Sequence, residues 1–513
     1  MKFKILISLF LSALSLQSLA NDKELKVYFK CYGQFLQERL DIDNDQLAQK
    51  IKLGRITGSE ACMNLLNRAD LGSDGIISQD STNLDEFGFD RKGQKILKTF
   101  NDFHRNWFES YNLNAESFVS AGTVDVFDSG DMAYYITSTL FGGKPYSYAI
   151  TTDDSLEGVR KSKENGTRKR LLTGNSNLKL IRGSAKPQSA EEDQYQAWFP
   201  PLVQLGKLVG IKHRAPYSSS EDSSDENNHQ ADDRINLAGL GNADDEAANN
   251  MNIFRNLGAG AISTPSYLMM NLGTPQGKKT NGGLILHRRL SQSIIRDTLC
   301  RELPVIRSID ATKYVDSTGE SELPFRNGLS CMKCHATMDP MARLVRGVVR
   351  DRTARNGGTG KRGFPIQLAY EIATSETEHP NEFTGWIDES DSKFSARPKN
   401  GYFLYRTVAG ELVKFEERND RGLAGITEQI VELDDYYMCA SKRYLNFFTG
   451  IDIPLQDQGD FASIKFNNKD QTYFEFIQKL GQKLKKTQDL KQVIKMIIES
   501  NIYINPSQEY KDE

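Results

Sequence analysis

The run Cys331-Met332-Lys333-Cys334-His335 is the part of this chain best suited to chemistry. It reads C-x-x-C-H, the pattern at which haem is attached covalently in c-type cytochromes. Two thiols three residues apart can each form a thioether with one vinyl group of a single porphyrin, and the histidine that follows can bind the iron from the same side. We therefore expect one covalent haem c, with Cys331 and Cys334 as its anchors and His335 as the proximal iron ligand.

Three other uses of two cysteines at this spacing stay open: a disulfide between them, a thiol–disulfide redox pair, and half of a zinc site. A redox pair is expected beside a strand–helix unit, but the residues before the motif, 328–330, have no strand pattern. A zinc site needs a second close pair of Cys or His ligands, and none follows the motif. With six Cys and six His in 513 residues, chance alone would produce the pattern in roughly one such chain in a thousand. Haem attachment is the reading that we favour.

The N-terminus predicts export, in agreement with the haem motif, because bacteria attach haem to C-x-x-C-H outside the cytoplasmic membrane. Two of the first four residues are lysines, an apolar run follows over residues 5–16, and Ser18-Leu19-Ala20 has the small-x-small pattern of a cleavage site. This run is too short to span a bilayer, and no later stretch approaches the required length. We expect a signal peptide over residues 1–20 and a periplasmic or secreted protein, without a transmembrane segment, after cleavage near Ala20.

The composition and net charge of the chain bear on the kind of partner that it binds. Apolar residues make up 38% of the chain and charged residues 26%, and the net charge is −3. These values describe an ordinary globular protein and give no reason to expect nucleic acid or an anionic membrane as a partner.

The four cysteines outside the haem motif predict two disulfides, since an oxidising compartment is expected, and they allow three pairings. We favour Cys31–Cys62 and Cys300–Cys439. The first pair closes a loop of about 30 residues between neighbouring predicted helices, which the loop-entropy model values at on the order of 3 kcal/mol. The second pair ties the helix before the haem motif to a helix near the C-terminus.

Helices must position these residues, because helical periodicity dominates the chain. Apolar residues recur at steps of three and four over residues 24–40, 92–111, 290–303, 430–447, 474–484 and 490–502. Thr57 and Glu60 form a capping box for one further helix, and Gly450 is a natural helix cap. His104 and His287 lie on or beside such helices and are expected to be structural.

Short β segments are expected between the helices. Residues 134–140 and 147–151 predict short strands, and residues 402–405 and 412–415 predict a β-hairpin. Residues 217–250 are rich in Ser, Asp, Glu and Asn and predict a mobile acidic loop. The expected fold class is mainly α with small β insertions, in a multi-helix exported protein that contains a cytochrome c-like haem module.

This pattern divides the chain into six segments. They are the signal peptide (1–20), an N-terminal helical domain (21–135), a mixed region with the acidic loop (136–250), the haem-attachment module (251–354), a β-hairpin insertion (355–420) and the C-terminal helices (421–513).

The order of several blocks points to a family. The run Gly282 to Arg289 precedes a helix ending in Leu299-Cys300-Arg301-Glu302-Leu303-Pro304, and the haem motif is followed by Met338-Asp339-Pro340. This order resembles the large secreted cytochrome c-like proteins of the planctomycete cytochrome type, whose C-x-x-C-H module is soon followed by Asp-Pro. Residues 103–108 resemble the upstream helical module of that family, and residues 439–450 and 494–503 resemble its C-terminal helices. The resemblance covers about two-thirds of the mature chain and implies haem binding and electron transfer, without identifying a redox partner.

We predict a mono-haem c-type cytochrome that exchanges electrons with redox partner proteins, rather than a catalyst. One alternative is a haem-dependent peroxidase or oxidase with an open axial position on the iron. Another is a haem-free secreted interaction protein in which Cys331 and Cys334 form a disulfide.

The axial ligands of the iron separate the carrier from the enzyme. The second ring nitrogen of His335 should be held by a backbone carbonyl or a carboxylate. Met338 and Met341 follow His335 too closely to reach the far side of the porphyrin. The remaining candidates for that side are Met269, Met270, His379, Met438 and Met496. We favour Met438, because it adjoins an aromatic stripe on a helix that Cys439 would tether towards the haem segment.

Overall fold

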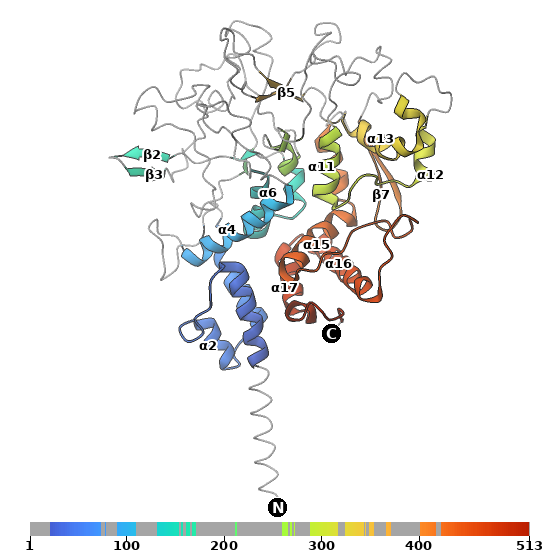
Figure 1. Cartoon of the computed structure of the whole chain (residues 1–513). Helices are drawn as coiled ribbons and strands as arrows, with labels where there is room; N and C mark the ends of the chain where they lie inside the picture. The colour runs from blue at the N-terminus through green and yellow to red at the C-terminus, as the bar shows by residue number, and fades with distance from the viewer. Residues whose placement is uncertain are drawn as a thin grey trace, which may run out of the picture.

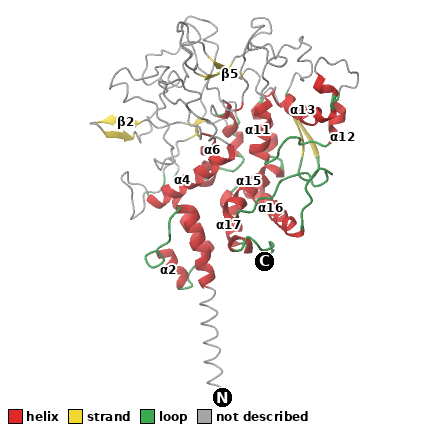
Figure 2. Cartoon of the chain, in the orientation of Figure 1, coloured by secondary structure: helices red, strands yellow, loops and turns green. Residues whose placement is uncertain are grey.

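A computed structural model describes the chain over residues 21–72, 90–108, 131–152, 259–264, 288–315, 324–342, 401–416 and 422–511, together with a few short pieces between these ranges. The described part is mainly helical, as the sequence predicted, and its strands form only small two-stranded sheets (Figures 1 and 2).

The first helix covers residues 21–36. The labelled helices follow in chain order: α2 (Gln46–Lys52), α3 (Gly58–Leu66), α4 (Arg91–Arg105), α6 (Asp131–Phe141), α7 (Tyr148–Thr151), α11 (Arg288–Leu299), α12 (Ser308–Ala311), α13 (Leu329–Ala342), α14 (Leu423–Ile430), α15 (Asp434–Thr449), α16 (Asn468–Thr487), α17 (Leu490–Glu499) and α18 (Asn501–Ile504). Short 3-10 turns include η2 (Asn106–Phe108), which extends α4, η7 (Gly260–Ser263), and η9 (Pro324–Asn327), which precedes α13.

The described strands pair as four antiparallel sheets of two. The pairs are β1 (Ser155–Leu156) with β4 (Ile211–Lys212), β2 (Lys161–Glu164) with β3 (Thr167–Arg170), β5 (Val348–Arg352) with β6 (Ile366–Tyr370), and β7 (Tyr402–Arg406) with β8 (Leu412–Glu416). The last pair confirms the predicted hairpin, with Tyr402 opposite Glu416 and Arg406 opposite Leu412. Its turn contains Gly410 at φ +85°, a conformation that favours glycine.

The strands predicted over residues 134–140 and 147–151 are wrong, because both segments are helical, in α6 and α7. Tyr and Thr favour strands, but such preferences yield to tertiary packing. In α6 the side chains of Met132, Ile136 and Leu140, which recur every four residues, are all buried. The Thr137 hydroxyl donates to the Ala133 carbonyl at 2.8 Å, as threonines inside helices commonly do. The segment boundary predicted between residues 135 and 136 therefore falls inside a helix.

The N-terminal and C-terminal helices share one core. In Figure 1 α15, α16 and α17 run beside one another at the lower right, and α15 packs most extensively on α16. The ring of Phe35, from the first helix, packs against that of Phe448 on α15 with centroids 6.1 Å apart. Gln34 Nε2 donates to the Phe448 carbonyl at 3.0 Å. The described residues of the segments 21–135 and 421–513 thus share one hydrophobic core.

Local signals set several helix ends. Thr57 and Glu60 form the predicted capping box at the start of α3. Gly450 ends α15 in the left-handed conformation at φ +76°, which confirms its predicted role. The helix predicted from residue 430 onward is two helices, since α14 ends at Ile430 and α15 begins at Asp434.

Two disulfides lie in the core, with the pairings that the sequence favoured. Cys31 is bonded to Cys62, with Cα atoms 6.0 Å apart, and Cys300 to Cys439, with Cα atoms 5.2 Å apart. The second bond joins the residue after α11 to the middle of α15. Two such bonds are compatible with a secreted protein, because disulfides persist in oxidising compartments.

Some expectations lie outside the described residues: the signal peptide over 1–20, the acidic loop over 217–250, His287, Met269, Met270 and His379. None of the described helices combines the length and the apolar character that crossing a bilayer requires.

Candidate haem-attachment site

The C-x-x-C-H motif lies on α13, and one face of this helix anchors it to the protein. Cys331 and Met332 donate their backbone N–H groups to the Gly328 carbonyl, so the helix starts directly before the motif. Met332 and Ala336 are buried on the inner face, in a small apolar cluster shared with Ile306, Ala311 and Leu404. This cluster is separate from the main core and rests on α12 and β7, which both pack against α13 (Figure 1).

The three residues with haem chemistry share a different face of α13. Cys331, Cys334 and His335 are spaced i, i+3 and i+4, and residues at this spacing are neighbours on a helix surface. Cys331 is exposed, while Cys334 and His335 are half-buried. Both thiols and the imidazole can therefore be reached from the same side by one planar group.

Both thiols are free. The structure has no bond between Cys331 and Cys334, so the disulfide of the haem-free alternative is not present. Burial raises the pKa of Cys334, and Lys333 only partly offsets this effect. Cys334 is therefore held as a neutral thiol, which makes it less reactive in disulfide exchange than a thiolate would be.

A carboxylate holds the imidazole of His335. His335 Nδ1 lies 3.0 Å from Asp339 Oδ2, one helical turn further along α13. Arg288, at the start of α11, donates from Nε to Asp339 Oδ1 at 2.6 Å and from Nη2 to Oδ2 at 3.2 Å. Burial by itself raises the pKa of Asp339, but the hydrogen bonds from His335 and Arg288 outweigh it and hold this pKa below its usual range. Asp339 is thus a carboxylate at neutral pH.

This arrangement fixes the tautomer of His335. A carboxylate can only accept, so Nδ1 is the nitrogen that carries the proton and donates it to Asp339. Nε2 then presents its lone pair, as an iron ligand must. The Phe325 ring stacks on the imidazole with centroids 4.2 Å apart, and the Arg288 guanidinium lies 5.4 Å from the centre of that ring. No described residue makes a hydrogen bond with Nε2, which leaves it available for iron.

The structure does not bring Met438 to this site. Met438 is buried on α15, and its Cγ would lie 2.8 Å from a Cβ placed on Gly481 of α16. It belongs to the main core, whereas the α13 residues beside the motif, Met332 and Ala336, belong to the smaller cluster. The Met438 side chain packs between α15 and α16. The structure therefore gives no support to the prediction that Met438 is the distal ligand. Met496 also packs against the main core.

His104 has the structural role that the sequence predicted. It is completely buried, with Nδ1 2.8 Å from the Thr137 hydroxyl and Nε2 2.8 Å from the Tyr444 hydroxyl. Burial, with a smaller contribution from Arg443, lowers its pKa well below 6.5. Both ring nitrogens are occupied inside the core, which leaves neither for a metal.

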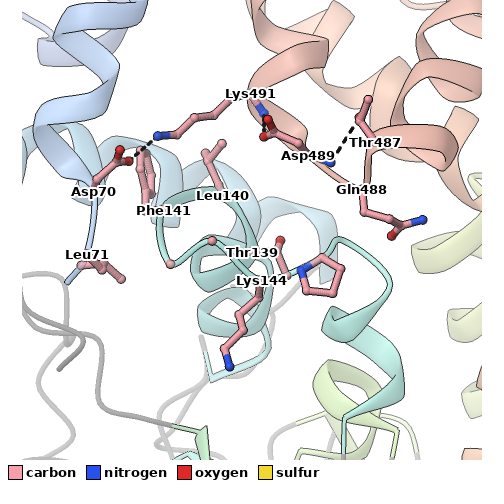
Figure 3. A pocket seen from close by; sticks show the side chains of 13 residues that line it. Asp70, Leu71, Thr139, Leu140, Phe141, Lys144, Thr487, Gln488, Asp489 and Lys491 are labelled. Carbon is pink, nitrogen blue, oxygen red and sulfur yellow. Dashed lines mark hydrogen bonds and ion pairs between the residues drawn. The ribbon is translucent and has the colours of Figure 1, made fainter. Parts of the chain in front are cut away.

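A separate pocket of about 590 Å³ lies between the end of α6 and the turn joining α16 to α17, and none of its lining residues belongs to α13 (Figure 3). Lys491 crosses it to form an ion pair with Asp70. Burial nevertheless raises the pKa of Asp70, since it outweighs the attraction of Lys491. The described lining contains no His, Cys or Ser, so this pocket lacks the chemistry of α13.

The sequence predicted a carboxylate or a carbonyl on His335 and gave no sign of Arg288 or Phe325. Asp339 could have been found, since it lies four residues after His335 and on the same helix face. Arg288 is 51 residues from Asp339 in the chain, and only the packing of α11 on α13 brings it there.

Comparison of the chain with protein-family models, with curated proteins and with solved structures found no match. Within the described ranges, no group of three or more His, Cys, Asp and Glu side chains could hold a metal ion by itself. The resemblance to cytochromes thus stays a prediction that depends on α13 and its surroundings.

Proposed function

We propose that this protein is a mono-haem c-type cytochrome that exchanges electrons with a redox partner protein. The observation that carries the proposal is one accessible face of α13, with two unbridged thiols and an imidazole whose Nε2 makes no hydrogen bond with any described residue. Cys331 and Cys334 would hold the porphyrin through thioethers, and His335 would bind the iron. When bound, the haem supplies one-electron exchange at its iron.

The residues around the motif fit this cofactor. The thiols are free as thioether formation requires, the carboxylate of Asp339 orients the histidine, and Phe325 covers one face of the imidazole. The inner face of α13 is packed, so the helix is held while its outer face stays open to a ligand.

The proposal is tested by producing the full chain in the periplasm of a host with a haem c maturation system. We expect one haem mass on the intact protein, retained after denaturation, and a pyridine haemochrome spectrum typical of two thioethers. The double variant Cys331→Ala with Cys334→Ala should lose this mass, while Ser330→Ala, next to the motif, should keep it. A native, folded protein without a haem mass would overturn the proposal.

A haem peroxidase or oxidase is the second candidate, and one observation favours it. Met438, the distal ligand that a carrier was expected to use, packs into the main core instead. Cyanide and azide separate the two functions on the haem-loaded protein. A six-coordinate carrier keeps its spectrum when these anions are added, whereas an open iron position gives a rapid spectral change.

A further inference from the structure

The carboxylate of Asp339, beside His335, is well buried and firmly held although Cys331 on the same helix is exposed. The Asp339 side chain is only 9% exposed, and it receives three bonds, two from Arg288 and one from His335. A two-pronged guanidinium contact fixes the plane of a carboxylate as well as its charge. Oδ2, the oxygen that contacts His335 Nδ1, is therefore also held by Nη2 of Arg288 from α11.

We infer that Asp339, fixed by Arg288, is a positioning residue that increases electron donation from His335 and keeps the bound haem at a low reduction potential. This inference rests on the proposed function. It goes beyond that function because it assigns the direction in which the protein tunes its iron and names the residues responsible.

The physical reason is the charge of the acceptor. A histidine that donates its Nδ1–H to a carboxylate becomes a more basic ligand at Nε2 than one that donates to a neutral carbonyl. A more basic ligand stabilises the higher charge of ferric iron over ferrous iron, which lowers the potential. The negative charge of Asp339 also lowers the potential through space. This interaction is stronger than it would be in water, because Asp339 is largely buried.

Arg288 opposes this effect in part, since it brings a positive charge to the same carboxylate. Its guanidinium reaches both oxygens of Asp339, whereas the imidazole contacts Asp339 directly through Nδ1. The nearer, hydrogen-bonded anion dominates the ligand strength of His335, and Arg288 keeps that anion ionised in its buried place.

The test measures the reduction potential of the haem-loaded full chain and of Asp339→Asn. This variant keeps the shape of the side chain and an oxygen that can accept from His335, but removes the negative charge. We expect haem attachment to be unchanged. At a fixed solution potential, the ratio of ferric to ferrous protein should fall at least tenfold, a shift of about 59 mV for a one-electron couple.

Asp297→Asn is the matched control. Asp297 is a buried carboxylate on α11 with bonds to Arg296 and Tyr267, and neither bond involves His335. This variant should change the ferric-to-ferrous ratio less than threefold. An equal shift in both variants would overturn the inference, because it would show a general effect of buried charge.

Arg288→Lys keeps the inference falsifiable if Asp339→Asn does not fold. Lysine conserves the charge but loses the two-pronged contact, so the carboxylate should be held less firmly and the ratio should fall about threefold. An unchanged or increased ratio in a folded, haem-loaded variant would overturn the inference. Absence of haem from the unmodified protein would instead overturn the proposed function itself, so the two failures are distinguishable.

Discussion

His104 on α4 and His335 on α13 lie in two different parts of the molecule. His104 is enclosed by the main core, where the hydroxyls of Thr137 and Tyr444 occupy its two nitrogens. The His335 side chain is 18% exposed, and among the described residues its one hydrogen-bond partner is a carboxylate, at Nδ1. Neutral partners on both nitrogens make a histidine structural, whereas an anion on one nitrogen prepares the other for a metal.

The cysteines follow the same division. Four of them form the two disulfides of the core, and the other two are free on α13. The cysteines of the core thus stabilise the fold as disulfides, whereas the two cysteines on α13 are unbonded thiols. For both histidine and cysteine, the role of a residue thus depends on whether it lies in the main core or on α13.

Loss of the longer disulfide loop should have the largest effect on stability. Cys300 and Cys439 are 139 residues apart, and the loop-entropy model values this bond at about 5 kcal/mol. Replacing both with Ala should lower the free energy of unfolding by about that amount in urea titrations followed by circular dichroism.

Cys31→Ala with Cys62→Ala gives the matched comparison. These residues are 31 apart, and the shorter loop makes this bond worth about 1 kcal/mol less. The haem content of this variant should equal that of the unmodified protein, since the bond lies in the main core and not beneath α13. Loss of haem in a folded sample would contradict the division into two regions.

Removal of His104 should have the next largest effect, and it should depend on pH. The folded pKa of His104 is lowered, so below about pH 6.5 the unfolded chain binds a proton that the folded chain does not. Stability from this group is therefore complete above pH 6.5 and falls as the pH is lowered, by up to about 1.4 kcal/mol per pH unit. His104→Gln should cost about 2 kcal/mol at pH 7.5, through lost buried hydrogen bonds.

The measurement is the urea midpoint of both proteins at pH 7.5, 6.5 and 5.5. The unmodified protein should lose more stability between the last two values than the variant does, because glutamine does not titrate. Parallel losses in the two proteins would show that other groups set this part of the pH profile.

Local patterns predicted much of the fold. The capping box of α3, the glycine at the end of α15 and the hairpin of β7 and β8 each depend on a few neighbouring residues, and all three are present. In α6 the local preference of Tyr and Thr for strands was overridden by packing against α4, which no pattern in α6 itself encodes.

The site shows the same limit. The residues of the haem motif are adjacent in sequence, so the sequence alone indicated their chemistry. The Arg288 contact depends on how α11 packs on α13, and the place of Met438 depends on how α15 packs on α16. Contacts between distant segments have no local signature, so the sequence suggested a ligand that the core in fact uses for packing.

The smallest expected effect concerns how α13 is held to its small cluster. Thr337 is buried, and its hydroxyl donates to the Leu404 carbonyl of β7 at 2.8 Å. Thr337→Val keeps the shape but loses this bond, and should cost about 1 kcal/mol in urea titrations. Thr298→Val on α11 is the control, because the buried Thr298 hydroxyl donates to the Ile294 carbonyl within its own helix, and loss of that bond should cost about 0.5 kcal/mol or less. An equal or larger cost for Thr298→Val would mean that the hydroxyl link from Thr337 to β7 stabilises α13 no more than a threonine bond within one helix does.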